Sequence, residues 1–353
     1  MRRAEIVAFL EARFPRSLAE EWDHSGLQVG DLSGPCRRVL VALDLEIKHL
    51  ELLPQVDLVV THHPLLFRPL SEIRVETPLG QKLKALFSAD VALFSLHTPY
   101  DSAHGGLGEV LAGYLELKNA EPILPRGQLL KLVVFVPKGH EERVAQALFS
   151  AGAGKIGKYG HCSFRIEGTG TFLPEEGAKP FLGEIGREEH VKEIRLETIV
   201  PAERAERVVE AMLAAHPYEE VAYDLYPLSL RSSLHGLGRV GELSRPRMVS
   251  AVLGQFAENL GVSQPQIFVG PKDREIRRVA ICGGSGGNLI PQAIAKRAEL
   301  YITGEAGYHQ LKEAEEAGLA VAVFGHAETE RPFIRHIAGL LREAFPELEV
   351  VEG

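Results

Sequence analysis

Short apolar runs alternate with longer amphipathic stretches in the first and last thirds of the chain. Continuous apolar runs predict buried strands at residues 38–44, 57–61, 91–96, 277–282, 299–303 and 320–324. Helical periodicity predicts helices at residues 45–53, 78–88, 106–116, 288–297, 307–317 and 329–344. Short apolar strands separated by amphipathic helices indicate an α/β fold, in which a largely parallel sheet is covered on both faces.

The middle of the chain has a different pattern. A polar stretch with two prolines, residues 116–128, marks a boundary. Residues 131–152 and 193–217 each contain an apolar run, a proline and an amphipathic stretch, which predicts a repeated β-α unit. With the β-rich segments that follow them, these units favour a small α+β domain of the ferredoxin-like kind. We therefore expect an inserted domain at residues 127–232, flanked by residues 1–126 and 233–353, which together form one discontinuous α/β domain.

Composition narrows the class of protein. The chain is 45% apolar and 25% charged, as in an ordinary globular protein, which excludes a disordered chain. The net charge of −9 argues against a protein that coats nucleic acid by bulk charge, although a local basic groove stays possible. Three widely spaced cysteines suggest a reducing compartment without a disulfide framework. Because no apolar run has membrane-spanning length and the N-terminus is amphipathic, we expect a cytoplasmic protein without membrane partners.

Five expected strands in the outer segments run straight into polar or glycine-rich turns. These turns are residues 61–64, 97–101, 283–287, 303–305 and 325–330. Ligands of open parallel sheets bind beyond the carboxyl ends of the strands. We therefore expect the five turns to converge on one edge, although they are far apart in the sequence.

One of these turns carries two adjacent histidines, and the next carries a histidine and an aspartate. His62 and His63 follow a buried strand, and neighbouring side chains on an extended backbone point apart, so the pair suits two neighbouring ions better than one. The alternative is one core and one surface histidine. Asp101 lies four residues after His97 and is a candidate metal ligand with an imidazole neighbour, or else the cap of a helix that begins near Gly105.

The turn at residues 325–330 combines an imidazole with a carboxylate. His326 and Glu330 are four residues apart, so on a helix they share a face and both reach one centre. Glu330 has two oxygens with which to bridge two cations. The alternative is that both residues only cap and begin the last helix.

The glycine-rich turn offers a candidate anion site. Gly284, Ser285 and Gly286 follow a strand and precede a helix, where backbone N–H groups can approach a phosphate of the substrate. Close packing between strand and helix explains the glycines equally well. The sequence has neither a Walker motif nor a dinucleotide-binding fingerprint here.

Together, these turns supply at least three imidazoles and two carboxylates, without cysteine. Such donors suit Zn, Fe, Mn, Co or Ni, and the sequence does not choose among them. Two ions that share a carboxylate activate a water for hydrolysis. The chain lacks a Gly-x-Ser-x-Gly elbow and a catalytic cysteine motif, so a covalent hydrolase is disfavoured.

The same motifs carry a resemblance to a known family. In chain order, WDHSGLQVG, VVTHHPLLF, SLHTPYD, GGSGG, YITGE and FGHAETER resemble the GTP cyclohydrolase 1 type 2 homologues, also called Nif-three-like dinuclear metal centre proteins. The segments AGAGKIGKYGHCSFR, GTGTF and HPYEEVAYDLYPL resemble the PII- or CutA-like insert of the longer bacterial members. The resemblance implies two α/β lobes with the insert between them. It also implies a homohexameric ring whose metal pairs face an internal cavity.

The resemblance further implies a division of the metal ligands. One ion would be held by His63, Asp101 and Glu330, and the other by His62, His326 and the bridging Glu330.

His97 would lie beside the ions as a substrate-binding or supporting group, and His97 or Glu305 would move protons. The chain departs from the family pattern at His24 and Pro99, where asparagine is usual, and at Glu305, where aspartate is common.

Two functions follow as hypotheses. The first is a metal-dependent hydrolase that acts on a nucleotide-like substrate. In the reaction implied by the family name, a metal-bridging hydroxide opens the imidazole ring of GTP and releases formate. The second is a non-catalytic metal-binding scaffold, or a protein that interacts with regulators or nucleic acid.

Overall fold

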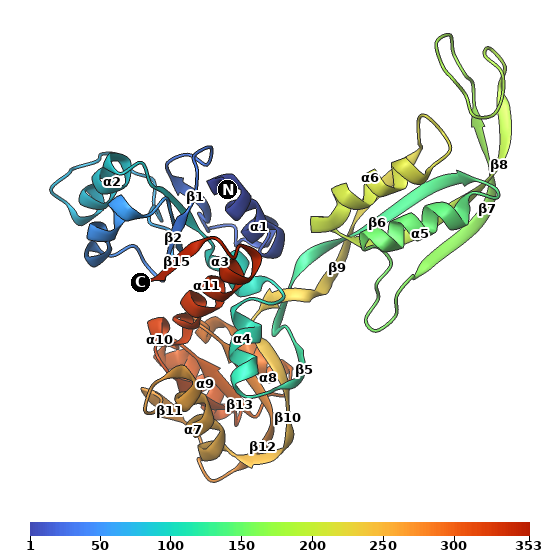
Figure 1. Ribbon diagram of the computed structural model, residues 1–353. Coiled ribbons are helices and arrows are strands. Elements are labelled where there is room, and N and C mark those ends of the chain that lie inside the picture. The colour runs from blue at the N-terminus through green and yellow to red at the C-terminus, as the bar shows by residue number, and fades with distance from the viewer. The chain divides into compact units, whose positions relative to one another are not determined.

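The chain forms two compact units in the computed structural model (Figure 1). Residues 1–126 and 234–353 form the larger unit, and residues 127–233 form the smaller one. The structure describes residues 1–353, apart from the side chains of Ser232 and Ser233. None of its described helices has the length and apolar character needed to cross a bilayer.

The first lobe of the larger unit is built on a five-stranded sheet. Its strands have the order β1-β4-β3-β2-β15, and only β1 runs antiparallel to its neighbour. The strands are β1 (Gly26–Val29), β2 (Arg38–Ala42), β3 (Leu58–Thr61), β4 (Ala92–Ser95) and β15 (Glu349–Glu352). Because side chains alternate along a strand, Val39 and Val41 pack with α1 (Arg3–Arg13) and α11 (Pro332–Ala344), whereas Leu40 packs toward α2 (Pro78–Ser88).

The second lobe is built on a six-stranded mixed sheet with the order β11-β14-β13-β12-β10-β5. Its strands are β5 (Lys118–Glu121), β10 (Arg239–Met248), β11 (Ile267–Val269), β12 (Glu275–Cys282), β13 (Leu300–Thr303) and β14 (Ala320–Val323). The central strands β12, β13 and β14 are parallel, whereas β5, β10 and β11 pair antiparallel. The α/β class is therefore confirmed, with one sheet more mixed than predicted.

Helices cover both faces of the second sheet. Side chains of α4 (Leu107–Tyr114) and α7 (Val249–Leu260) pack on one face, in an apolar core that is continuous with the core of the first lobe. Side chains of α8 (Ile290–Ala295) and α9 (Tyr308–Glu316) pack on the other face. The shared core fixes the two lobes against each other, which is required for a site that draws on both.

Prolines explain two differences from the predicted helices. The segment predicted as a helix at residues 45–53 is a 3₁₀ helix, η2 (Ile47–Gln55), which contains Pro54. The helix predicted at residues 329–344 is divided into α10 (His326–Glu330) and α11, because Pro332 has no N–H to donate and starts a new helix. The pair His326 and Glu330 thus occupies a short helix of its own, and does not begin the last one.

The smaller unit has the element order β-α-β-β-α-β. Its elements are β6 (Leu124–Pro137), α5 (Glu141–Ala151), β7 (Ser163–Phe172), β8 (Glu189–Pro201), α6 (Ala205–Ala215) and β9 (Tyr223–Leu237). The sheet order is β7-β8-β6-β9, and both helices pack through apolar side chains against this sheet. This element order is that of ferredoxin-like domains.

Candidate metal centre

The carboxyl ends of β3 and β4 place three histidines side by side. The N–H groups of His62 and His63 donate to the carbonyl groups of Ala42 and Leu43, at 3.2 and 3.0 Å, so the strand ladder continues into the turn. The N–H of His97 donates to the carbonyl of His62 at 2.9 Å. The rings of His62 and His63 have centroids 5.5 and 5.7 Å from that of His97.

The backbone around these histidines is held tightly. The hydroxyls of Thr61 and Ser95 lie 2.8 Å apart, and they approach the carbonyl oxygen of His63 to 2.8 and 3.2 Å. His97 begins the short helix α3 (His97–Ser102) with a φ of 38°, a left-handed conformation that is unusual for a residue with a side chain. Such conformations persist where the surrounding structure imposes them, and they cluster at functional sites.

The second lobe contributes helix α10. Nε2 of His326 lies 3.0 Å from Oε2 of Glu330, one helical turn later. Gly284, in the turn after β12, has a φ of +60°, and a Cβ at this position would lie only 2.1 Å from Oε1 of Glu330. Its N–H donates to Oγ1 of Thr329 at 3.0 Å. Because Gly284 has no side chain, the carboxylate of Glu330 fits beside it.

The two oxygens of Glu330 face different groups. Oε2 lies 3.0 Å from Nε2 of both His63 and His326. Oε1 lies 3.5 Å from Nε2 of His62, which in turn is 3.7 Å from Oδ1 of Asp101. Oε1 of Glu330 thus faces His62, and Oε2 faces His63 and His326. The division of the ligands between two ions that the resemblance implies stays a prediction.

We call His62, His63, Asp101, His326 and Glu330 the cluster. Carboxylates outside the cluster orient three imidazole rings, two within it and that of His97 beside it. Asp44 lies 3.1 Å from Nδ1 of His63, and Glu305 lies 3.2 Å from Nδ1 of His326, so that Nε2 of each ring faces Glu330. Asp23 lies 2.6 Å from Nδ1 of His97. Partners of this kind fix the orientation of metal-binding imidazoles.

Two of these three carboxylates were not predicted from the sequence. Asp44 follows the end of β2, so the strand-end pattern that identified His62 also applies to it. Asp23 lies in the turn before β1, where no buried strand precedes it.

Proton affinities in the cluster are strongly perturbed. Burial opposes protonation of His63, but the carboxylates of Asp44 and Glu330 outweigh it and raise the pKa of His63 to about 10. The bond to Glu330 raises the pKa of His326 to about 9. Burial raises the pKa of Asp101 to about 7. Burial also disfavours an ionised Glu330, but His62 and the other imidazoles around it hold its pKa far below the usual range. Protons on imidazoles thus balance the buried charge of Glu330, a role that a cation can take over.

The donor set fits a metal ion. His62 is fully buried, and neither of its ring nitrogens has a hydrogen-bond partner among the described residues. Oδ1 of Asp101 is likewise buried and unbonded there. Buried polar atoms without hydrogen-bond partners lower the stability of the fold, and a bound cation would give these atoms a partner. Ligand atoms of His62, His63 and Glu330 lie within 4.8 Å of one another, so this group can hold a metal ion.

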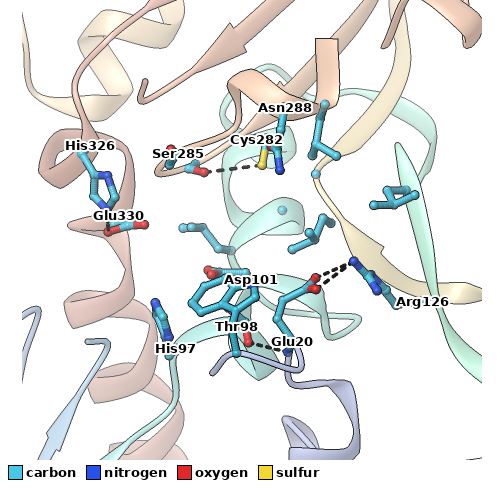
Figure 2. A pocket seen from close by; sticks show the side chains of 18 residues that line it. Glu20, His97, Thr98, Asp101, Arg126, Cys282, Ser285, Asn288, His326 and Glu330 are labelled. Carbon is cyan, nitrogen blue, oxygen red and sulfur yellow. Dashed lines mark hydrogen bonds and ion pairs between the residues drawn. The ribbon is translucent and has the colours of Figure 1, made fainter. Parts of the chain in front are cut away.

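A cavity of about 220 Å³ opens beside the cluster (Figure 2). His97, Asp101, His326 and Glu330 line one side of it. On the other side, Arg126 forms an ion pair with Glu20 at 2.7 Å. The half-exposed ring of Trp22 also lines the cavity, with its centroid 5.6 Å from that of His97. A small polar molecule therefore has access to the carboxylates of the cluster.

The glycine-rich turn reaches this cavity with Gly283 and Ser285. Ser285 lines the cavity, but the N–H of Gly286 donates to the carbonyl of Gly284, and the N–H of Gly284 is bonded to Thr329. The amides of both glycines thus already have partners within the protein. Cys282 in the cavity wall is a neutral thiol, because burial raises its pKa to about 12.

Comparison with known proteins identifies the family. The chain matches Duf34/NIF3 (NGG1p interacting factor 3) over residues 1–352. It belongs to this family. The resemblance predicted from the motifs is thereby confirmed.

Relatives of this Duf34/NIF3 protein match along most of its length. The GTP cyclohydrolase 1 type 2 homolog of Bacillus subtilis is 40% identical over 326 residues, which cover 91% of this chain and 87% of the relative. The homolog of the same name from Mycobacterium tuberculosis is 35% identical over 350 residues, covering 98% and 92%. The crystal structure of a Bacillus cereus protein related to NIF3 is similar at 37% identity with a TM-score of 0.85, covering 100% of this chain and 96% of that one.

Proposed function

We propose that this Duf34/NIF3 protein is a hydrolase that uses two divalent metal ions. The observation that carries the proposal is the position of Glu330, whose Oε1 faces His62 and whose Oε2 faces His63 and His326. A carboxylate between two groups of imidazoles suits a bridging ligand of an ion pair. Asp101 would complete the group of His62, at 3.7 Å from its Nε2. These donors suit Zn, Fe, Mn, Co or Ni.

The residues around the ions would do the remaining chemistry. When bound, the ion pair would lower the pKa of a water and polarise the substrate for hydrolysis. His97 lines the cavity, and Asp23 engages its Nδ1, which leaves Nε2 to take or give a proton. Glu305 would keep His326 oriented through Nδ1, rather than move protons itself.

A nucleotide-like substrate is part of the proposal. The relatives are named GTP cyclohydrolase 1 type 2 homologs, and the proposed reaction is opening of the imidazole ring of guanine with release of formate. Trp22 offers a ring face on which a base can stack, and Arg126 offers a guanidinium for a phosphate. We further propose that the active form is the homohexameric ring which the family resemblance implies, and size measurements in solution test this part.

Formate release tests the reaction. The metal-loaded protein is incubated with GTP, and formate is measured for the wild type, His63→Ala and the matched control His309→Ala. His309 is an exposed histidine on α9 of the same unit. We expect formate from the wild type and from His309→Ala, and none from His63→Ala. Full metal binding without formate would reject the cyclohydrolase reaction in favour of the non-catalytic scaffold.

A further inference from the structure

The smaller unit contains a cavity of its own, of about 310 Å³. Its lining residues belong to β6, the end of β7, the segment that follows β7, β8 and the turn after α6. Its wall is mostly apolar and includes the rings of Phe135, Phe172, Phe181 and Tyr218. The centroid of Tyr218 lies 6.0 Å from that of Phe172 and 6.2 Å from that of Phe181. A concave apolar wall with few polar groups is typical of a small-molecule site.

The charges that line this cavity have one sign. Its described lining contains four glutamates and neither lysine nor arginine. Three of these glutamates are exposed, but Glu193 on β8 is only 8% exposed. A buried carboxylate among apolar groups is costly unless a cation or several hydrogen bonds compensate it. The lining therefore favours a positively charged occupant.

Glu193 is held with one oxygen free to receive such an occupant. Its Oε1 accepts a hydrogen bond from the hydroxyl of Tyr218 at 3.1 Å, and Oε2 has no hydrogen-bond partner among the described residues. On the neighbouring strand, a Cβ at Gly170 would lie 2.1 Å from Oε2. The glycine therefore leaves room for Oε2 at the cavity wall, which both residues line.

Tyr218 is itself fixed by its surroundings. Its N–H donates to Nδ1 of His216 at 3.1 Å, and Nε2 of His216 lies 3.0 Å from the carbonyl oxygen of Phe135. Burial and the charge of Glu193 raise the pKa of Tyr218, so its hydroxyl remains a hydrogen-bond donor. The ring and the carboxylate thus form a preorganised pair rather than two mobile side chains.

We propose that this cavity binds an organic cation, namely a substituted ammonium group that carries an apolar body. Aromatic rings attract cations through their faces, Glu193 supplies the opposite charge, and the apolar wall receives the body of the ligand. One buried carboxylate among aromatic rings is a poor set of ligands for a divalent metal ion, which prefers several oxygens. All residues of the cavity lie in the smaller unit, so the proposal does not depend on the metal centre.

Calorimetric titration of the full chain tests the charge preference. The probes are benzyltrimethylammonium, neutral benzyl alcohol and anionic phenylacetate, which share a benzyl body and differ in charge. We expect the cation to bind at least about tenfold more tightly than either other probe. Equal affinity for benzyl alcohol would show that apolar contacts alone drive binding, and this would overturn the proposal. Absence of binding by the cation would overturn it as well.

Two variants test the residues. Glu193→Gln keeps an acceptor for Tyr218 but removes the charge, and we expect it to weaken cation binding about tenfold. Phe181→Leu keeps an apolar side chain at a half-exposed position and should weaken binding about threefold. The matched control is Glu197→Gln, because Glu197 lies on the same strand, pairs with Arg195 at 2.8 Å and does not line the cavity. Unchanged binding in Glu193→Gln, with melting temperature and control intact, would contradict the proposal.

Discussion

Nε2 of His63 and Oε2 of Glu330 lie 3.0 Å apart, although His63 follows a strand of the first lobe and Glu330 belongs to a helix of the second. Glu330 is the only described residue that contacts all three of His62, His63 and His326 among the ion pairs of the cluster. It is therefore the residue on which the cluster depends most.

Replacement of Glu330 should abolish metal binding. In Glu330→Ala, both imidazole groups lose the carboxylate that lies between them, so we expect no bound metal after purification and dialysis. His309→Ala, which alters an exposed histidine outside the cluster, should keep the wild-type content. Elemental analysis measures both, and two ions per wild-type chain are expected. A wild-type metal content in Glu330→Ala would place the ions elsewhere.

Gly284→Ala should damage the centre without touching a ligand. The new Cβ would meet Oε1 of Glu330 at 2.1 Å in a left-handed backbone conformation, so Glu330 has to move. We expect metal affinity to fall, and the free energy of unfolding to fall by at least about 1 kcal/mol.

The control for this substitution is Gly254→Ala on α7, where a Cβ meets nothing within 4 Å. That change should stabilise the protein by about 0.5–1 kcal/mol, because alanine is the better helix former. Chemical denaturation measures both variants. Equal effects of the two substitutions would show that the space beside Glu330 is unimportant.

Metal binding should release protons. In the metal-free protein, the pKa values of about 10 for His63 and about 9 for His326 keep both rings protonated at pH 8. A metal ligand must be a neutral imidazole, so binding has to displace these protons. The apparent affinity should therefore rise with pH and level off above about pH 10. Calorimetry at pH 8 in buffers of different ionisation enthalpy counts the protons, and a buffer-independent enthalpy would refute the prediction.

Asp23→Asn should separate catalysis from metal binding. Asp23 contacts Nδ1 of His97 and accepts from the N–H of Thr98, but it does not contact the residues around Glu330. We expect the metal content to stay at the wild-type level and formate release to fall about 10- to 100-fold, as for other partners that orient an imidazole. Loss of metal in this variant would instead make His97 part of the metal cluster.

The strand-end pattern explains why much of the site is predictable from sequence. His62, His63, Asp101, His326 and Glu330 all follow or adjoin buried strands of sheets with parallel centres, and the structure brings them together. Their identity as metal ligands remains a prediction.

Other features of the site depend on distances between side chains, which the pattern of apolar and polar residues along the sequence does not contain. The orientation of each ring decides which oxygen of Glu330 it faces, so the sequence did not reveal that Oε1 faces His62 whereas Oε2 faces His63 and His326. The role of Asp23 likewise depends on a turn that packs against α3. Short edge strands such as β11 have three residues, too few for a clear hydrophobic period.

The interruption of the larger unit by residues 127–233 has a consequence for biosynthesis. His62 and His63 leave the ribosome early, but Glu330 and strand β15, which pairs with β2, emerge only after the whole smaller unit has been made. The ribosome adds about 5–20 residues per second, so many seconds pass between the synthesis of His62 and His63 and that of Glu330 and β15. A nascent chain halted before residue 330 lacks Glu330, so under the proposed function it could not hold the metal ions that a chain carrying Glu330 would bind.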